Sequence, residues 1–283
     1  MKAASQGDSG LFMNPRLHKF LAPCVAALAL LWAAHASADL GQVIPMGDLE
    51  RWTTFSLGDG SEPDRFSNDS FVQGDVGVAG NGDLTLAGNA AISGDVYYKS
   101  NGTLRVAKDA TIGGSRFNNQ NSLLNDGVDQ ALTASDAAAG LTATRSFDEV
   151  NLSGAENISL TGAPGETVVL NLKAFKMSGN STLTLDGSAN TTYIINVKKQ
   201  FSLAGHASIV LTGGLTWNDV LFNVRGKGDE VMLSRDSSFQ GVLMANKRTV
   251  RVRDNAIVSG QIIADSVQLQ GSSQVLHPPV VSP

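Results

Sequence analysis

FKMSGNSTL, residues 175–183, is one copy of a nine-residue repeat that recurs along the chain. In every copy the first, third and ninth positions are apolar, and positions five and six are mostly Gly, Asn, Asp, Lys or Arg. Side chains alternate between the two faces of a strand, so positions one and three share a face. Gly and Asn tolerate positive φ, which suits a sharp bend in the middle. The repeat therefore predicts a strand, a corner and a second strand.

The other seven copies are irregularly spaced. They begin at Leu84, Leu104, Val150, Phe201, Val231, Val250 and Val267. A repeat of about 20 to 25 residues is typical of a β-solenoid, in which each coil covers the apolar face of the coil before it. A β-sandwich of short strands is the alternative, but it offers no reason for one corner chemistry to recur. The sequence therefore predicts an all-β fold, a discontinuous β-solenoid (β-helix).

One stretch near residues 120–143 interrupts the strands. Its apolar residues recur at helical spacing: Leu123, Leu124, Val128, Leu132 and Ala139. Such a stripe indicates an amphipathic helix that buries one face. We expect one long helix packed along the side of the solenoid.

The N-terminus has the features of a secretory signal peptide. Arg16, His18 and Lys19 precede an apolar run at 20–34, and small residues follow at 36–38. The run is too short for a membrane span, so residues 1–38 predict export to the medium or the cell surface. Met13 is an alternative start. After cleavage no cysteine remains, which excludes disulfides and thiol chemistry in the mature chain.

The mature chain divides into three parts by composition. Residues 39–69 are acidic and predict an N-terminal cap that closes one end of the stack. Residues 70–275 hold the repeats and predict the solenoid domain. Residues 276–283 are rich in proline, which cannot continue a strand ladder, and predict a flexible tail.

The sequence contains few residues that would indicate catalysis or metal binding. His206 lies at a repeat corner and His277 in the tail, so neither predicts a metal site or a catalytic triad. Asp75 and Asp95 lie at corners, where aspartate caps its own turn. The formal charge of −5 argues against nucleic acid as a partner. We expect no enzyme activity, no metal and no cofactor.

Two surfaces are candidates for binding. Position eight of the repeat is rich in small residues, and a column of these suits an ordered surface such as ice: Thr111, Thr182, Ser208 and Ser238. Position two includes Arg105, Lys176 and Arg251 and does not suit ice. The second candidate is a basic strip: Arg225, Lys227, Arg235, Lys247, Arg248, Arg251 and Arg253. This strip is either a solvated face or a docking site for an acidic polymer or for the acidic end of another copy, so self-association is a further expectation.

The order of the segments resembles known secreted domains. GDV coils and one helix are followed by VLFNV from Val220, QGVLMA from Gln240 and SGQIIA from Ser259. This order, over roughly residues 70 to 275, resembles the bacterial choice-of-anchor A domain and is similar to the ice-binding-protein-like solenoid family. The resemblance implies an extracellular protein with structural, adhesive or surface-binding roles. No C-terminal sorting segment follows, which favours free secretion over covalent anchoring.

The main functional prediction is therefore an exported, non-catalytic module of an extracellular matrix or of cell-surface adhesion. Its expected partner is an extracellular polysaccharide or another cell-surface polymer. Ice binding through the small-residue column is the alternative. A carbohydrate-active β-helix enzyme is the third hypothesis, and the scarcity of aromatic side chains argues against it.

Overall fold

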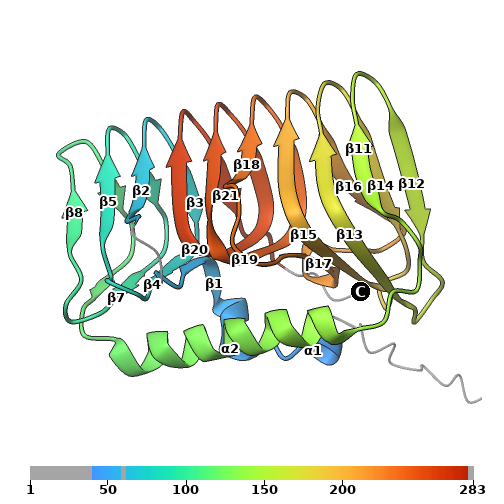
Figure 1. Ribbon diagram of the computed structural model, residues 1–283. Helices are drawn as coiled ribbons and strands as arrows, with labels where there is room; N and C mark the ends of the chain where they lie inside the picture. Colours follow the sequence, from blue (N-terminus) through green and yellow to red (C-terminus); the bar gives the residue numbers. More distant parts are fainter. Residues whose placement is uncertain (1–39, 59–61, 280–283) are drawn as a thin grey trace, which may run out of the picture. The chain divides into compact units, whose positions relative to one another are not determined.

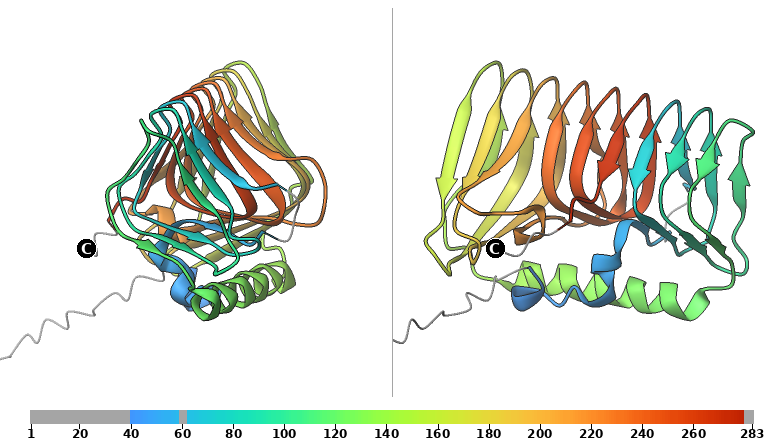
Figure 2. Two further views of the ribbon diagram at one scale, coloured as in Figure 1. Left: turned by 90° about the vertical axis from the view of Figure 1, so that its left-hand side faces the viewer. Right: turned by 180° about the vertical axis from the view of Figure 1, so that it is seen from behind.

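The computed structural model describes residues 40–58 and 62–279. The predicted signal peptide lies outside these residues. The described residues form 21 strands, all paired in parallel, which coil into a solenoid and confirm the predicted fold class (Figure 1). Seen end-on, the coils enclose a roughly triangular core (Figure 2). Among residues 40–58 and 62–279, no helix has both the length and the apolar character that a membrane crossing needs.

Three parallel sheets form the sides of the solenoid, and the longest strands bend from one sheet into another. Sheet A consists of the first halves of β13 (Thr167–Met177) and β15 (Thr192–Ala204), then β17 (Val220–Val224), the middles of β19 (Ser238–Arg253) and β20 (Ile257–Gln270), β1 (Trp52–Ser56), β4 (Asp75–Val78), β7 (Val96–Tyr98) and β10 (Arg116–Phe117). Sheet B consists of β11 (Glu149–Leu152), the second halves of β13 and β15, β18 (Val231–Ser234), the ends of β19 and β20, β2 (Asp64–Ser67), β5 (Leu84–Ala87) and β8 (Leu104–Val106).

Sheet C consists of β12 (Asn157–Thr161), β14 (Thr182–Asp186), β16 (Ser208–Thr212), the starts of β19 and β20, β21 (Gln274–Leu276), β3 (Phe71–Gln73), β6 (Ala91–Ile92) and β9 (Thr111–Ile112). The nine-residue repeat runs from sheet B into sheet C. Its middle lies at the corner between them, where Gly179 (φ 71°) and Asp254 (φ 55°) adopt the positive φ that the repeat predicted. Strand, corner and strand are therefore confirmed.

A ninth copy of the repeat spans residues 64–72, DRFSNDSFV. It follows the same path, with Asn68 (φ 56°) at the corner and Phe66 and Val72 in the core. Its first position is Asp64 instead of an apolar residue, so the apolar pattern alone does not detect it. β1 and β2 lie inside the stack, where they pair with β20 on one side and with β4 and β5 on the other. The expected end cap is thus an interior coil, preceded by α1 (Leu40–Val43) and a 3-10 turn, η1 (Gly47–Arg51).

The predicted helix is present as α2 (Asn121–Gly140), which lies along sheet A and returns the chain from β10 at one end of the stack to β11 at the other (Figure 1). Twenty residues of helix span about 30 Å. Its buried face is rich in alanine, with Ala131, Ala134 and Ala138 fully covered, whereas Leu132 of the expected stripe is 39% exposed. Small residues face the sheet because the helix lies close to it.

Asparagines in one column of sheet A bind the C-terminal half of α2. The Asn223 side-chain amide donates to Ser135 O (2.9 Å) and to Asn196 Oδ1 (2.8 Å), and the Ser135 hydroxyl donates to Asn223 Oδ1 (2.8 Å). The Asn196 amide donates to Ala138 O (2.9 Å) and to Asn171 Oδ1 (2.9 Å). This asparagine ladder fixes the helix against the sheet with hydrogen bonds as well as apolar contacts.

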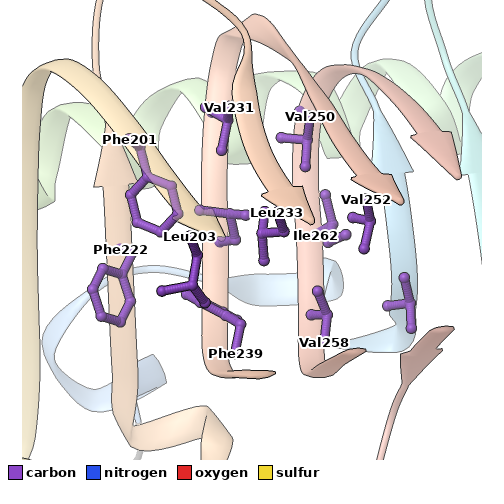
Figure 3. Close-up of a cluster of buried hydrophobic side chains, with 14 of the residues drawn as sticks. Phe201, Leu203, Phe222, Val231, Leu233, Phe239, Val250, Val252, Val258 and Ile262 are labelled. Atoms are coloured by element: carbon purple, nitrogen blue, oxygen red, sulfur yellow. The ribbon is translucent and has the colours of Figure 1, made fainter. Parts of the chain in front are cut away.

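The interior between the sheets is filled by stacked apolar columns (Figure 3). Phe175 and Phe201 stack with ring centroids 5.0 Å apart, and Phe222 and Phe239 lie 5.1 Å apart. The tail begins within this fold, because Leu276 ends β21 and the Trp217 indole, in the 3-10 turn η2 (Trp217–Asp219), donates to Pro278 O (2.9 Å). Residues 280–283 lie outside the described residues.

Candidate functional site

The three sheets differ in what they present to solvent. The outward side of sheet A packs against α2 and the segment at 40–51, in a second apolar cluster that includes Leu49 and, from β1 itself, Trp52 and Phe55. Buried Gln261 of β20 donates there to Trp52 O (2.6 Å). Sheet A is therefore covered, and sheets B and C remain as candidate binding surfaces.

Sheet B carries charge along its outward column at repeat position two. Arg65, Arg105 and Lys176 occupy this column, as does Arg251. Arg251 pairs with Glu230 (2.7 Å) and with Glu62 (3.2 Å). The structure therefore makes sheet B a charged surface with long side chains.

Sheet C presents the predicted small-residue column. Thr182, Ser208 and Ser238 are register neighbours on β14, β16 and β19, and Asn157 on β12 extends the column to the end of the stack. The Thr182 and Ser208 hydroxyl oxygens are 3.3 Å apart. Thr111 belongs to the same column at the opposite end, with larger residues between: Ile257, Gln274 and Phe71.

A second outward column of sheet C runs beside the first and is absent from the sequence prediction. Ser159, Thr184 and Val210 are register neighbours in it. They lie two residues past position eight, beyond the nine-residue window, and period-two alternation extended by one residue would have found them. Together with the next positions of β12 and β16 they define what we call the small-residue patch: Asn157, Ser159, Thr161, Thr182, Thr184, Ser208, Val210, Thr212 and Ser238.

Charge is nearly absent from this patch. On the outward positions of β12, β14 and β16 the one ionisable side chain is Asp186, which accepts a hydrogen bond from the Thr212 hydroxyl (2.7 Å). The patch therefore offers short hydroxyl, amide and methyl groups on a regular parallel sheet.

The residues of the predicted basic strip do not form one surface. Arg225 pairs with Asp136 of α2 (3.0 Å), whereas Arg251 and Arg253 lie on sheet B and Arg235 lies at the corner with φ 58°. Lys227 and Lys247 are both exposed.

Arg248 is 2% exposed and acts inside the fold. Its guanidinium donates to backbone carbonyls at the corner between sheets A and B: Lys198, Lys199, Arg225, Gly226 and Asp229. Burial lowers the pKa of this guanidinium. Arg248 therefore joins neighbouring coils and is not available as a binding cation.

Two cavities have charged side chains in their linings. A groove of about 550 Å³ beside α2 is lined by Asp136, Arg225 and Lys247 among others. A cavity of about 80 Å³ is lined by Asp64, whose pKa burial raises to about 7. Within the described ranges, no three His, Cys, Asp or Glu side chains are arranged to hold a metal.

The corner aspartates have a structural role. Asp75 Oδ1 accepts from the Asp95 amide (2.8 Å), and Asp95 Oδ1 accepts from the Ser115 amide (2.7 Å). Each carboxylate thus accepts a hydrogen bond from the backbone of the next coil, whereas the sequence predicted that each aspartate caps its own turn.

The chain is similar to one protein family and to several solved structures. The model of a family described as ice-binding-like matches residues 66–274. Among solved structures, an ice-binding protein from an Arctic yeast has a TM-score of 0.55 at 19% identity, over 87% of this chain and 97% of that chain. An ice-binding protein from an Antarctic bacterium of the Flavobacteriaceae gives 0.56 at 19% identity, over 84% of this chain and 49% of that chain.

A domain of an ice-binding protein from Shewanella frigidimarina gives a TM-score of 0.52 at 15% identity, over 84% of this chain and 98% of that chain. No curated protein sequence matches the chain. At such low identities these structures establish the shared solenoid fold. The ice-binding-like part of the sequence resemblance is confirmed by the family match, whereas the choice-of-anchor A part stays a prediction.

The main functional prediction from the sequence is wrong. A matrix or cell-surface adhesion module was expected, but the family model and the similar structures are those of ice-binding proteins. Secreted solenoids with different functions share strand, corner and core chemistry, so these features could not separate the two functions. The sequence analysis gave ice binding through the small-residue column only as its alternative.

Proposed function

Because the chain belongs to the ice-binding-like family, we propose that it binds ice through the small-residue patch of sheet C. The observation that carries this proposal is the unbroken column of Asn157, Thr182, Ser208 and Ser238 on adjacent strands. Ice binding breaks no covalent bond, in keeping with the expectation that the protein is not an enzyme. The export signal predicted at residues 1–38 suits a protein that meets ice outside the cell.

The chemistry of the patch matches that of an ordered water surface. Serine and threonine hydroxyls both donate and accept hydrogen bonds, as water does. Parallel strands lie about 4.7–4.9 Å apart, so β14, β16 and β19 repeat these groups at a regular spacing. A lattice of water molecules is best met by many such weak contacts arranged at regular intervals.

Short side chains also favour this patch over sheet B. Fixing a Lys or Arg side chain costs roughly 1.5–2 kcal/mol of rotamer entropy, whereas short side chains lose less. Threonine is further restricted at χ1 by its branched Cβ. Charged groups such as Arg105 and Lys176 would in addition lose hydration against a neutral solid. Sheet B is therefore less suited to ice than the small-residue patch, and it serves as the comparison face.

The test compares two serines of the same coil. Ser208 lies in the patch and Ser202 lies on sheet B, and both are half-buried and face outward. We expect the purified protein to inhibit ice recrystallisation and to show thermal hysteresis. Ser208→Tyr should remove most of this activity, because the ring holds the neighbouring hydroxyls away from ice. Ser202→Tyr should retain it.

Two results would refute the proposal. An inactive unmodified protein excludes ice binding. Equal losses in Ser208→Tyr and Ser202→Tyr, with both variants folded by circular dichroism, exclude sheet C as the face.

A further inference from the structure

The two ends of the solenoid are open sheet edges. At one end, β8 pairs only with β5 and β9 only with β6 among the described residues. At the other end, β11 pairs only with β13 and β12 only with β14 within the same residues. Figure 1 shows β8 at one extreme of the stack and β11 and β12 at the other. An unpaired strand edge is a template for pairing with another chain.

Core residues at both ends are also less covered than those of the inner coils. Leu84, Leu86 and Ile92 of an inner coil are at most 1% exposed. Their counterparts in the terminal coil, Leu104, Val106 and Ile112, are only partly buried, although the sequence pattern predicts the same core position for both sets. At the opposite end, Phe147, Ile158 and Leu160 are partly buried, whereas Val150 and Leu152 of β11 are only 4% and 6% exposed. Among the described residues no further coil covers either end, and the loss of cover is greatest at Leu104, Val106 and Ile112.

The two ends have matching corners. The terminal coils carry the repeats that begin at Leu104 and at Val150, so β8 and β11 hold positions one to three. β9 and β12 hold positions eight and nine. The corner between the two strands has the same length in both copies. One coil can therefore stack on the other in register on sheets B and C at once.

The charges of the two ends are opposite. Residues 99–117 contain four bases and one acid: Lys99, Arg105, Lys108, Arg116 and Asp109. Residues 141–166 contain one base and four acids: Arg145, Asp148, Glu149, Glu156 and Glu166. Arg105, Lys108 and Glu149 are exposed. Charged side chains at a sheet edge commonly prevent pairing with another chain. Here two basic ends, or two acidic ends, would repel each other, whereas a basic end and an acidic end would attract.

We propose that copies of this chain associate head to tail, with β8 and β9 of one copy pairing in parallel with β11 and β12 of the next. Stacking in register places Arg105 beside Asn151 and diagonal to Glu149 of the next copy, within reach of a cross-strand ion pair. Such a contact is heterologous and leaves a free end on each copy, so the assembly is open-ended.

Head-to-tail stacking has a consequence for sheet C, and this consequence alone depends on the proposed ice binding. Thr111 at the end of one copy becomes the register neighbour of Asn157 in the next. The isolated Thr111 and Ala91 then continue the small-residue patch across the junction. Assembly thereby joins patches that the larger residues Ile257, Gln274 and Phe71 separate within one copy.

Sedimentation of the purified protein over a concentration series tests the assembly without reference to ice. We expect the average mass to rise with concentration past that of a dimer without reaching a plateau. Raising the salt from about 0.1 M to about 1 M shortens the screening length from about 10 Å to about 3 Å and should lower that mass. A mass that stays at one chain, or that stops at a dimer, overturns the proposal.

Charge-reversed ends give the sharper test. The first variant is Arg105→Glu with Lys108→Glu, and the second is Glu149→Lys with Asn151→Lys. Each should stay monomeric alone, because its two ends then repel. An equimolar mixture should assemble again, since each reversed end meets a complementary end of the other variant. Failure of the mixture to assemble, with both variants folded, contradicts the pairing of these ends.

Discussion

At the scale of single residues, Asp64 is the most unusual member of the repeat. It occupies position one, where the other copies have Val, Leu or Phe, and it is 4% exposed. Burial raises the pKa of its carboxyl to about 7, although the Ser56 hydroxyl and the Val267 amide (2.7 Å) donate to it. An acid in a core column therefore remains protonated in the folded protein over much of the acidic range.

The raised pKa predicts a pH-dependent stability. The folded carboxyl keeps its proton up to about pH 7, whereas the unfolded chain releases it near pH 3.8. The contribution of Asp64 to the free energy of unfolding is therefore greatest below about pH 4, decreases up to about pH 7 and is constant above that. The slope is at most about 1.4 kcal/mol per pH unit. Asp64→Asn should abolish this dependence.

Urea unfolding of the unmodified protein and of Asp64→Asn, at matched pH values from about 4 to 8, measures the difference. We expect the variant to gain stability relative to the unmodified protein as the pH rises. Parallel pH profiles would show that Asp64 ionises freely in the folded state.

At the scale of elements, α2 depends on the asparagine ladder for its position. Alanines on its buried face supply little apolar area each, since burial contributes roughly 25 cal/mol per Å². Hydrogen bonds from Asn196 and Asn223 to helix groups add directional contacts in a largely buried site, where these side chains are 3% and 0% exposed. The helix therefore docks at one position along the sheet.

The ladder predicts unequal effects of two matched substitutions. Asn223→Ala leaves Ser135 Oγ and Asn196 Oδ1 without this partner inside the protein, which should cost about 2–3 kcal/mol in the free energy of unfolding. Asn171→Ala, at the exposed end of the same ladder, should cost less than about 1 kcal/mol. Urea unfolding measures both values. Equal costs would mean that packing of α2, and not the ladder, holds the helix.

At the scale of the whole molecule, the order of coils in space differs from their order in the chain. The last coil, with β21, lies between β20 and β3, so both halves of the chain meet in the middle of the stack. The terminal coils are the two that flank α2, because the helix carries the chain from one end to the other. Removing apolar groups from the last repeat should therefore affect the centre of the fold.

Two valines test this order with the same substitution. Val275 belongs to the last repeat and is 0% exposed, whereas Val106 belongs to a terminal coil and is partly buried. Val275→Ala should cost roughly 2 kcal/mol, from lost burial and a residual cavity, and Val106→Ala clearly less. At this chain length the first loss lowers Tm by about 4–8 °C. A larger effect at Val106 would place the terminal coil elsewhere.

The sequence by itself determined the features that depend on residues close together in the chain. Alternation and the small or polar corner pair in FKMSGNSTL specify a strand, a bend and a strand, because φ preference and side-chain direction are local properties. Helical spacing identified α2 for the same reason. The column of Thr182, Ser208 and Ser238 also followed from the repeat, since equal positions of successive coils become neighbours.

Only the tertiary structure decided which coils are neighbours. Pairing of β1 with β20 joins residues that are far apart in the chain, and nothing local to residues 52–56 encodes that partner. The interior place of Asp64, the burial of Arg248 and the separation of Thr111 from the rest of its column all follow from this order. A solenoid coil presents similar edges at every step, so the sequence of each coil leaves its position open. The helix that carries the chain back along the stack and the packing of the first coil against the last decide it.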